Sequence, residues 1–214
     1  QSNLFSGIKD WTPKLDEIAK NNQYFTRFHA NGYTTEHGEL ALLTGLLPIT
    51  PPLENIYSAE SNFSGFSQYS YSLAHALKKA GYKTEFLTNS DLGFAGTREW
   101  VEGLGFDYIE GHEHPYYDNF ERYQFGAAPD AALYDRIFER ISEQAEKYFM
   151  FVKTTSSHQP HMDPDTGKQG EEAAFRYIDR ELGAFYDDLI TTDFFENGIL
   201  IIVGDHRAMV PLRK

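Results

Sequence analysis

The sequence of 214 residues contains no cysteine, which excludes disulfide bonds, thiolate metal ligands and a cysteine nucleophile. It also lacks a run of about 18 apolar residues, the length that a membrane-spanning helix needs, and shows no signal peptide at its start. Basic residues are few, because 19 Lys and Arg stand against 32 Asp and Glu, giving a formal net charge of −13. This charge disfavours nucleic acids and anionic lipid surfaces, which both bind basic protein surfaces.

The residues that are present indicate a single folded α/β domain. Hydrophobic residues make up 41% of the chain and aromatic residues 15%, which argues against disorder. The hydrophobic periodicity predicts helices that alternate with strands, the pattern of a mostly parallel sheet covered on both faces. Helices are predicted at residues 13–22, 69–80, 95–104, 129–147 and 171–189, and strands at residues 24–30, 83–88, 106–109, 148–153 and 199–203. A loop rich in Pro, Ser and Asn is predicted at residues 49–68, and we find no repeats or linkers.

Two hydroxyl side chains, Thr34 and Thr35, stand between a Gly-containing turn and an apolar run that is compatible with a helix. A hydroxyl at a helix N-terminus can meet a metal ion or an anion, because the unpaired N–H groups and the helix dipole favour negative charge there. The ordinary alternative is that one of these threonines caps the helix.

A second segment of interest ends the predicted strand at residues 199–203, where Asp205 and His206 follow directly. Ligands of open α/β sheets bind beyond the carboxyl ends of the strands. A carboxylate next to an imidazole suits zinc or manganese. Alone, such a dipeptide is usually part of a turn. It indicates a metal site only in combination with the threonine segment.

Together these segments resemble the sulfatase and alkaline phosphatase superfamily. The frame that runs from Thr35 through residues 41–45 (ALLTG) to Pro48 is similar to the nucleophile helix of that superfamily. Sulfatases have at this position a Cys or Ser that is converted to formylglycine. A threonine here is instead a feature that resembles the lipoteichoic acid synthases and glucan phosphoglycerol transferases. Glu39 also falls where lipoteichoic acid synthases carry an acidic residue.

The resemblance implies a three-layer α/β/α sandwich with a mostly parallel central sheet, as in alkaline phosphatase. It further implies a divalent metal, manganese or zinc, held by Thr35, Asp205 and His206, with Thr35 as the catalytic nucleophile. His158, in the loop after the strand at residues 148–153, matches the family's substrate histidine; its neighbour His161 is the second choice.

Arg98 is the other substrate-binding residue that the resemblance implies. The family places a Trp and an Arg near this position for the phosphoglycerol head group, and this chain offers Phe94 and Arg98 at an altered spacing. An arginine can bind phosphate with two parallel hydrogen bonds. A position on the helix surface is the ordinary alternative for Arg98.

From the resemblance we expect residues 1–214 to be one excised, sulfatase-like catalytic domain. We expect it to lack two parts of the complete domain: the first strand, which carries an anionic metal ligand in the family, and the C-terminal portion. The parent would be tethered to a bacterial membrane, with this domain on the extracytoplasmic side. The donor would be a phospholipid such as phosphatidylglycerol, whose head group would be transferred, and the acceptor would be a glycan or polymer. The alternatives are a non-catalytic domain that binds an envelope polymer or head group, a phosphoethanolamine transferase, and a sulfuric ester hydrolase.

Overall fold

A sheet of three parallel strands in the order β2-β1-β3 forms the centre of the chain. We describe it from a computed structural model, which covers residues 2–32, 34–47, 63 and 71–206. The strands are β1 (Lys83–Thr88), β2 (Tyr108–Glu110) and β3 (Tyr148–Lys153). Phe86 of β1 is in register with Ile109 of β2 and Phe151 of β3. Each connection between strands includes a helix, as parallel pairing requires.

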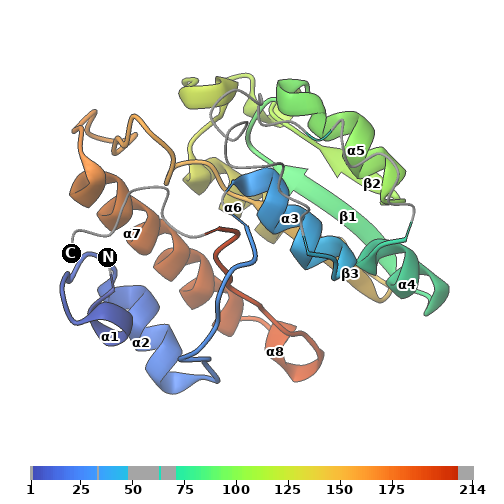
Figure 1. Cartoon of the computed structure of the whole chain (residues 1–214), viewed down its shortest axis with the longest axis horizontal. Helices are drawn as coiled ribbons and strands as arrows, with labels where there is room; N and C mark the ends of the chain where they lie inside the picture. Colours follow the sequence, from blue (N-terminus) through green and yellow to red (C-terminus); the bar gives the residue numbers. More distant parts are fainter. Residues whose placement is uncertain (1, 33, 48–62, 64–70, 207–214) are drawn as a thin grey trace.

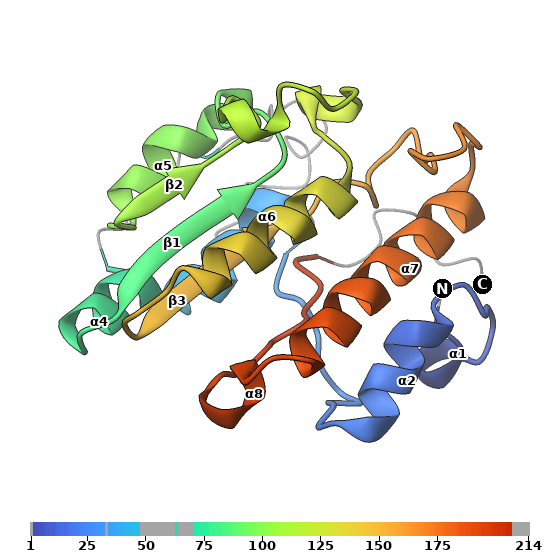
Figure 2. The same ribbon diagram turned by 180° about the vertical axis from the view of Figure 1, so that it is seen from behind.

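Helices cover both faces of this sheet (Figures 1 and 2). One face carries α3 (Thr35–Thr44), α4 (Leu73–Lys79) and α5 (Thr97–Gly103), and the other carries α6 (Asp130–Ser142). Beside α6 lies α7 (Glu171–Ile190), which in turn packs against α2 (Pro13–Asn21). The short helices α1 (Asn3–Ser6) and α8 (Phe194–Asn197) lie at the periphery. The expected three-layer α/β/α architecture is therefore confirmed.

The alternation of side chains along β1 builds a separate apolar core on each face of the sheet. Phe86 points towards α3, α4 and α5, where it joins Leu40, Leu43 and Trp100 in the first core. Leu87, the next residue, points the opposite way into a second core. That core also contains Leu133, Ile137, Leu182, Phe185 and Leu189 of α6 and α7.

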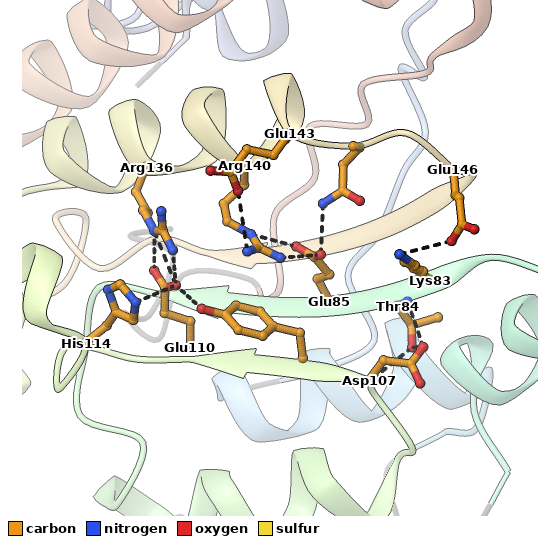
Figure 3. Close-up of polar contacts among 12 residues, drawn as sticks. Lys83, Thr84, Glu85, Asp107, Glu110, His114, Arg136, Arg140, Glu143 and Glu146 are labelled. Carbon is orange, nitrogen blue, oxygen red and sulfur yellow. Dashed lines mark hydrogen bonds and ion pairs between the residues drawn. The ribbon is translucent and has the colours of Figure 1, made fainter.

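Part of the face beneath α6 is ionic rather than apolar (Figure 3). Glu110 of β2 accepts hydrogen bonds from Nε and Nη2 of Arg136, the latter at 2.9 Å, and Glu85 of β1 pairs with Arg140, whose Nη2 lies 2.5 Å from Oε1. Burial raises the pKa of Glu110, but hydrogen bonds from Arg136 and Tyr108 outweigh it, and the net pKa is below the ordinary value. The helix pattern had predicted only the apolar stripe of α6.

Two predicted strands are wrong, because residues 24–30 and 199–203 are irregular in the structure. Their large apolar side chains are exposed, as shown by Phe25 at 69%, Ile199 at 83% and Ile201 at 77%. An apolar, β-branched run forms a strand only where a neighbouring strand accepts its hydrogen bonds. Among the described residues β3 pairs with β1, and neither segment is placed on its other edge.

The other elements are confirmed, with shifted ends that have local causes. Ser72 accepts a hydrogen bond from the N–H of His75 and so starts α4 at Leu73 rather than at residue 69. Ala95 has a φ of 55°, outside the helical region, so α5 begins only at Thr97, after the 3₁₀ turn η3 (Phe94–Gly96). The predicted loop at residues 49–68 and Pro48 lie outside the described residues, except for Phe63. Within the ranges given above, each helix is too short or too polar to span a bilayer.

Candidate active site

The first turn of α3 presents the two threonines that the sequence singled out. Thr34 has extended backbone angles and occupies the N-cap position, but its side chain makes no capping hydrogen bond. Thr35 is the first helical residue and is half-buried. Within the described part of the chain, its hydroxyl takes part in no hydrogen bond. The Thr35 hydroxyl is therefore available at a helix N-terminus, where the dipole favours an anion.

The structure brings this turn of α3 against the segment that carries Asp205 and His206. Gly38, one helical turn after Thr35, packs so closely that a Cβ at its position would overlap the backbone carbonyl of Asp205. Gly38 is thus a position where the absence of a side chain permits the contact. Asp205 and His206 lie next to each other, with 3.8 Å between Oδ2 and Nε2.

These residues offer oxygen and imidazole donors, a set that suits manganese or zinc. The side chains of Asp205 and His206 are 40% and 22% exposed, so an ion could reach both from solvent. In the described ranges, no group of three or more His, Cys, Asp and Glu side chains is arranged to hold a metal ion. The side chains of Asp205 and His206 therefore fit the chemistry of a metal site but do not by themselves complete one.

A buried ion pair lies beneath the first turns of α3. The carboxylate of Glu39 is 1% exposed, and Lys153, the last residue of β3, places its ammonium 3.3 Å from Oε1. The same ammonium lies 5.7 Å from the centre of the Phe86 ring. Burial raises the pKa of Glu39 to about 7; Lys153 opposes this shift, while Asp205 and Glu36 add to it. The sequence indicates the position of Glu39 but not its partner, because Lys153 lies far away along the chain.

Glu39 predicts a pH dependence of stability. Its folded-state pKa of about 7 lies above the ordinary 4.5, so between these values the folded chain binds more protons than the unfolded chain. The free energy of unfolding should then fall as the pH rises through this window, by roughly 3 kcal/mol. Urea unfolding at pH 5 and pH 8 measures the fall, and Glu39→Gln should reduce it by about this amount. Equal falls in both proteins would contradict the assignment.

The loop that carries His158 is anchored at its base by a network that the sequence did not indicate. Asp130, at the start of α6, is fully buried and accepts hydrogen bonds from the N–H groups of Thr155 and Ser156 at 3.0 and 3.2 Å. Asn89, after β1, donates to the same carboxylate at 2.7 Å. Burial raises the pKa of Asp130, while these bonds lower it. Because these residues are far apart in the sequence, no local pattern predicts the network.

His158 and Arg98 both lie in segments that follow strands of the sheet, but their side chains have different surroundings. The His158 imidazole is exposed, with Nδ1 2.9 Å from the carbonyl oxygen of Gln159. It lines a cavity of about 520 Å³ with Gln124, Gln159, Pro160 and His161. Arg98, in α5, is ion-paired with Glu113. The phosphate-binding role implied for Arg98 thus competes with an existing carboxylate partner.

Comparisons with known proteins show the family to which the chain belongs. The Sulfatase family profile matches residues 1–213. The chain is 26% identical to phosphoglycerol transferase I of Escherichia fergusonii over 224 residues, which cover 94% of the chain and 28% of that protein. It therefore spans less than a third of the length of this relative.

Solved structures show the same fold. A Vibrio parahaemolyticus protein of the alkaline phosphatase superfamily matches with a TM-score of 0.72 and 26% identity, over 88% of this chain and 47% of that one. A lipoteichoic acid synthase from Listeria monocytogenes matches with a TM-score of 0.70 and 22% identity, over 85% and 46%. With the family profile covering nearly all of its residues, this chain belongs to the sulfatase family, within the alkaline phosphatase superfamily.

Proposed function

We propose that this chain carries the catalytic site of a metal-dependent enzyme that transfers a phosphoglycerol group, with Thr35 as the nucleophile. The observation that carries the proposal is the contact between α3 and Asp205 at Gly38, one helical turn from the free hydroxyl of Thr35. Membership of the sulfatase family supports phosphoryl or sulfuryl transfer. The similarity to a phosphoglycerol transferase supports phosphoglycerol as the transferred group.

Thr35, Asp205 and His206 would hold the metal, manganese or zinc. When bound, the ion would lower the pKa of a coordinated hydroxyl and offset negative charge in the transition state. This help matters because a threonine hydroxyl is a weak nucleophile at its ordinary pKa.

The proposed reaction has two displacements at phosphorus. Thr35 Oγ attacks the phosphodiester and loses its proton, the Oγ–P bond forms, and the bond from phosphorus to the lipid oxygen breaks. That oxygen takes up a proton and leaves as diacylglycerol. The oxygen of an acceptor hydroxyl then attacks phosphorus and loses its proton, the bond from the acceptor oxygen to phosphorus forms as the Oγ–P bond breaks, and Thr35 Oγ takes up a proton.

Other residues would hold the phosphate during these steps. With its Nδ1 directed at a backbone carbonyl, His158 has Nε2 left for a phosphate oxygen, to which a protonated ring would donate. Arg98 would bind the phosphate only when its pair with Glu113 opens. We further propose phosphatidylglycerol as the donor, a glycan or polymer as the acceptor, and an extracytoplasmic site in a membrane-tethered protein.

The proposal predicts manganese-dependent turnover and a covalent intermediate. The natural protein at its full length, given manganese, should cleave a chromogenic phosphodiester, lose activity with EDTA and regain it when manganese is restored. After incubation with phosphatidylglycerol, mass spectrometry should find one added phosphoglycerol group on the peptide that contains Thr35. A folded, metal-loaded protein that shows neither turnover nor the added mass would contradict the proposal and favour a binding domain.

A further inference from the structure

Three non-glycine residues among those described have left-handed backbone angles. They are Ala95 with a φ of 55°, Phe125 with 59° and His161 with 47°. L-residues with a side chain rarely adopt this region, and a bulky aromatic residue there is an outlier. Such conformations persist where the surrounding structure enforces them, and they gather at functional sites.

The three residues lie in different loops yet adjoin a single row of rings. The centre of the Phe125 ring is 4.6 Å from that of the Phe94 ring and 4.6 Å from that of the His158 imidazole, and the Phe125 and His158 rings meet in a T-shaped arrangement at 82°. Ala95 is next to Phe94 in sequence. His161 donates its N–H to the carbonyl of His158 at 3.0 Å. Phe125 is the centre of this row.

The backbone around Phe125 is held in place from outside its own turn, η5 (Gln124–Gly126). Its carbonyl accepts a hydrogen bond of 3.0 Å from the N–H of Asp91, in the loop after β1. The carbonyl of Gly126 lies 2.5 Å from Nδ1 of His112, in the loop after β2. Together with the turn's own hydrogen bond from the N–H of Ala127 to the carbonyl of Gln124, these contacts hold the conformation in which the Phe125 ring lies against His158.

The Phe125 ring is one of two contacts that restrict rotation of the His158 imidazole. The His158 side chain is exposed, lies against the Phe125 ring, and places Nδ1 next to the carbonyl oxygen of Gln159. A carbonyl oxygen only accepts hydrogen bonds, so Nδ1 carries the proton of this bond. A side chain already fixed in its binding orientation loses less entropy when it meets its ligand. The imidazole lines a cavity together with Gln124 and His161, so a ligand in this cavity would contact His158.

We propose that Phe125 is a positioning residue, whose strained backbone is retained because its ring holds His158 in the orientation that binds phosphate. The inference rests on the proposed function for the role of His158. The ring contact and the strain are independent of that role, so they can be tested separately.

Two replacements of Phe125 separate the ring from the strain. Both Phe125→Ala and Phe125→Gly remove the ring, but only glycine relieves the left-handed backbone. We expect kcat/KM for the phosphodiester to fall to a similar extent in both, by roughly tenfold to a hundredfold. The glycine variant should nevertheless unfold at a higher temperature than the alanine variant. Phe125→Tyr, which keeps a ring, should restore most of the activity.

Ala95→Gly is the matched control, because it relieves the same kind of strain without removing a ring. We expect its kcat/KM to stay within about twofold of the starting protein. An equal loss in Ala95→Gly and Phe125→Gly, or no loss in Phe125→Gly, would overturn the proposal.

A measurement without turnover distinguishes this inference from the proposed function. In protein with labelled histidine rings, the His158 signals, assigned with His158→Asn, should shift in Phe125→Gly and not in Ala95→Gly, because an aromatic neighbour is lost. Unchanged His158 signals in Phe125→Gly would overturn the positioning role whatever the activity. Shifted signals together with full activity in His158→Asn would instead overturn the role of His158 in the proposed function.

Discussion

Thr35→Ala is expected to lower phosphodiester turnover by at least about a thousandfold, because it removes the attacking oxygen rather than a contact that supports it. The fold should survive, since the half-buried hydroxyl makes no hydrogen bond within the described residues and alanine favours a helix. Steady-state kinetics and circular dichroism on the same preparation measure both expectations. Thr35→Ser, which keeps a hydroxyl, should retain measurable turnover and form the covalent intermediate.

Thr34→Ala is the matched control, one residue away on the same turn. Thr34 sits at the N-cap without a capping hydrogen bond, so its replacement should change stability by no more than about 0.5 kcal/mol and turnover only a few-fold. The opposite result, full activity in Thr35→Ala and its loss in Thr34→Ala, would move the nucleophile to Thr34. Full activity in both variants would exclude a threonine nucleophile in this helix.

Local patterns in the sequence were enough to predict most of the elements that frame the site. The apolar run after Thr35 became α3, and the segments at residues 83–88 and 148–153 became β1 and β3 with the predicted bounds. Each of these signals is contained in a few neighbouring residues. By contrast, the runs at residues 24–30 and 199–203 have strand-like composition, but strand formation depends on a partner elsewhere in space.

The candidate site also contains some features that local sequence patterns predict and others that depend on contacts between distant residues. The threonine and the Asp-His pair could be named in advance because their residue types and spacing resemble those of the sulfatase and alkaline phosphatase superfamily, although the strand predicted before Asp205 is irregular in the structure. The burial of Glu39 against Lys153, the anchoring of Thr155 by Asp130, and the placing of Phe125 against His158 could not. These contacts join residues from different elements, and a phenylalanine in a left-handed turn has no local sequence preference that would predict it.

Arg136→Met is expected to lower the free energy of unfolding by about 3–5 kcal/mol, the largest stability effect that we predict. The change leaves the carboxylate of Glu110, which is 1% exposed, without its main cationic partner. Tyr108 still donates to it, and His114 lies 3.8 Å away, but neither replaces a guanidinium that bonds through two nitrogens (Figure 3). Urea unfolding followed by circular dichroism measures the change.

Arg176→Met provides the comparison on an exposed helix surface. Arg176 pairs with Glu172 at 2.9 Å, four residues earlier in α7, and both side chains are at least half exposed. Water and salt screen such a pair, so its loss should cost no more than about 0.5 kcal/mol. Equal effects of the two methionine substitutions would show that burial of Glu110 does not set the cost.

The double variant Glu110→Leu with Arg136→Met separates the cost of an unpaired charge from the contribution of the pair. If most of the loss in Arg136→Met comes from stranding a buried carboxylate, removing that carboxylate should recover at least half of it. If the double variant is as unstable as the single one, the ionic layer itself stabilises the packing of α6 on the sheet. Since α6 begins at Asp130, which anchors the loop of His158, that second result would also link this layer to the geometry of the candidate site.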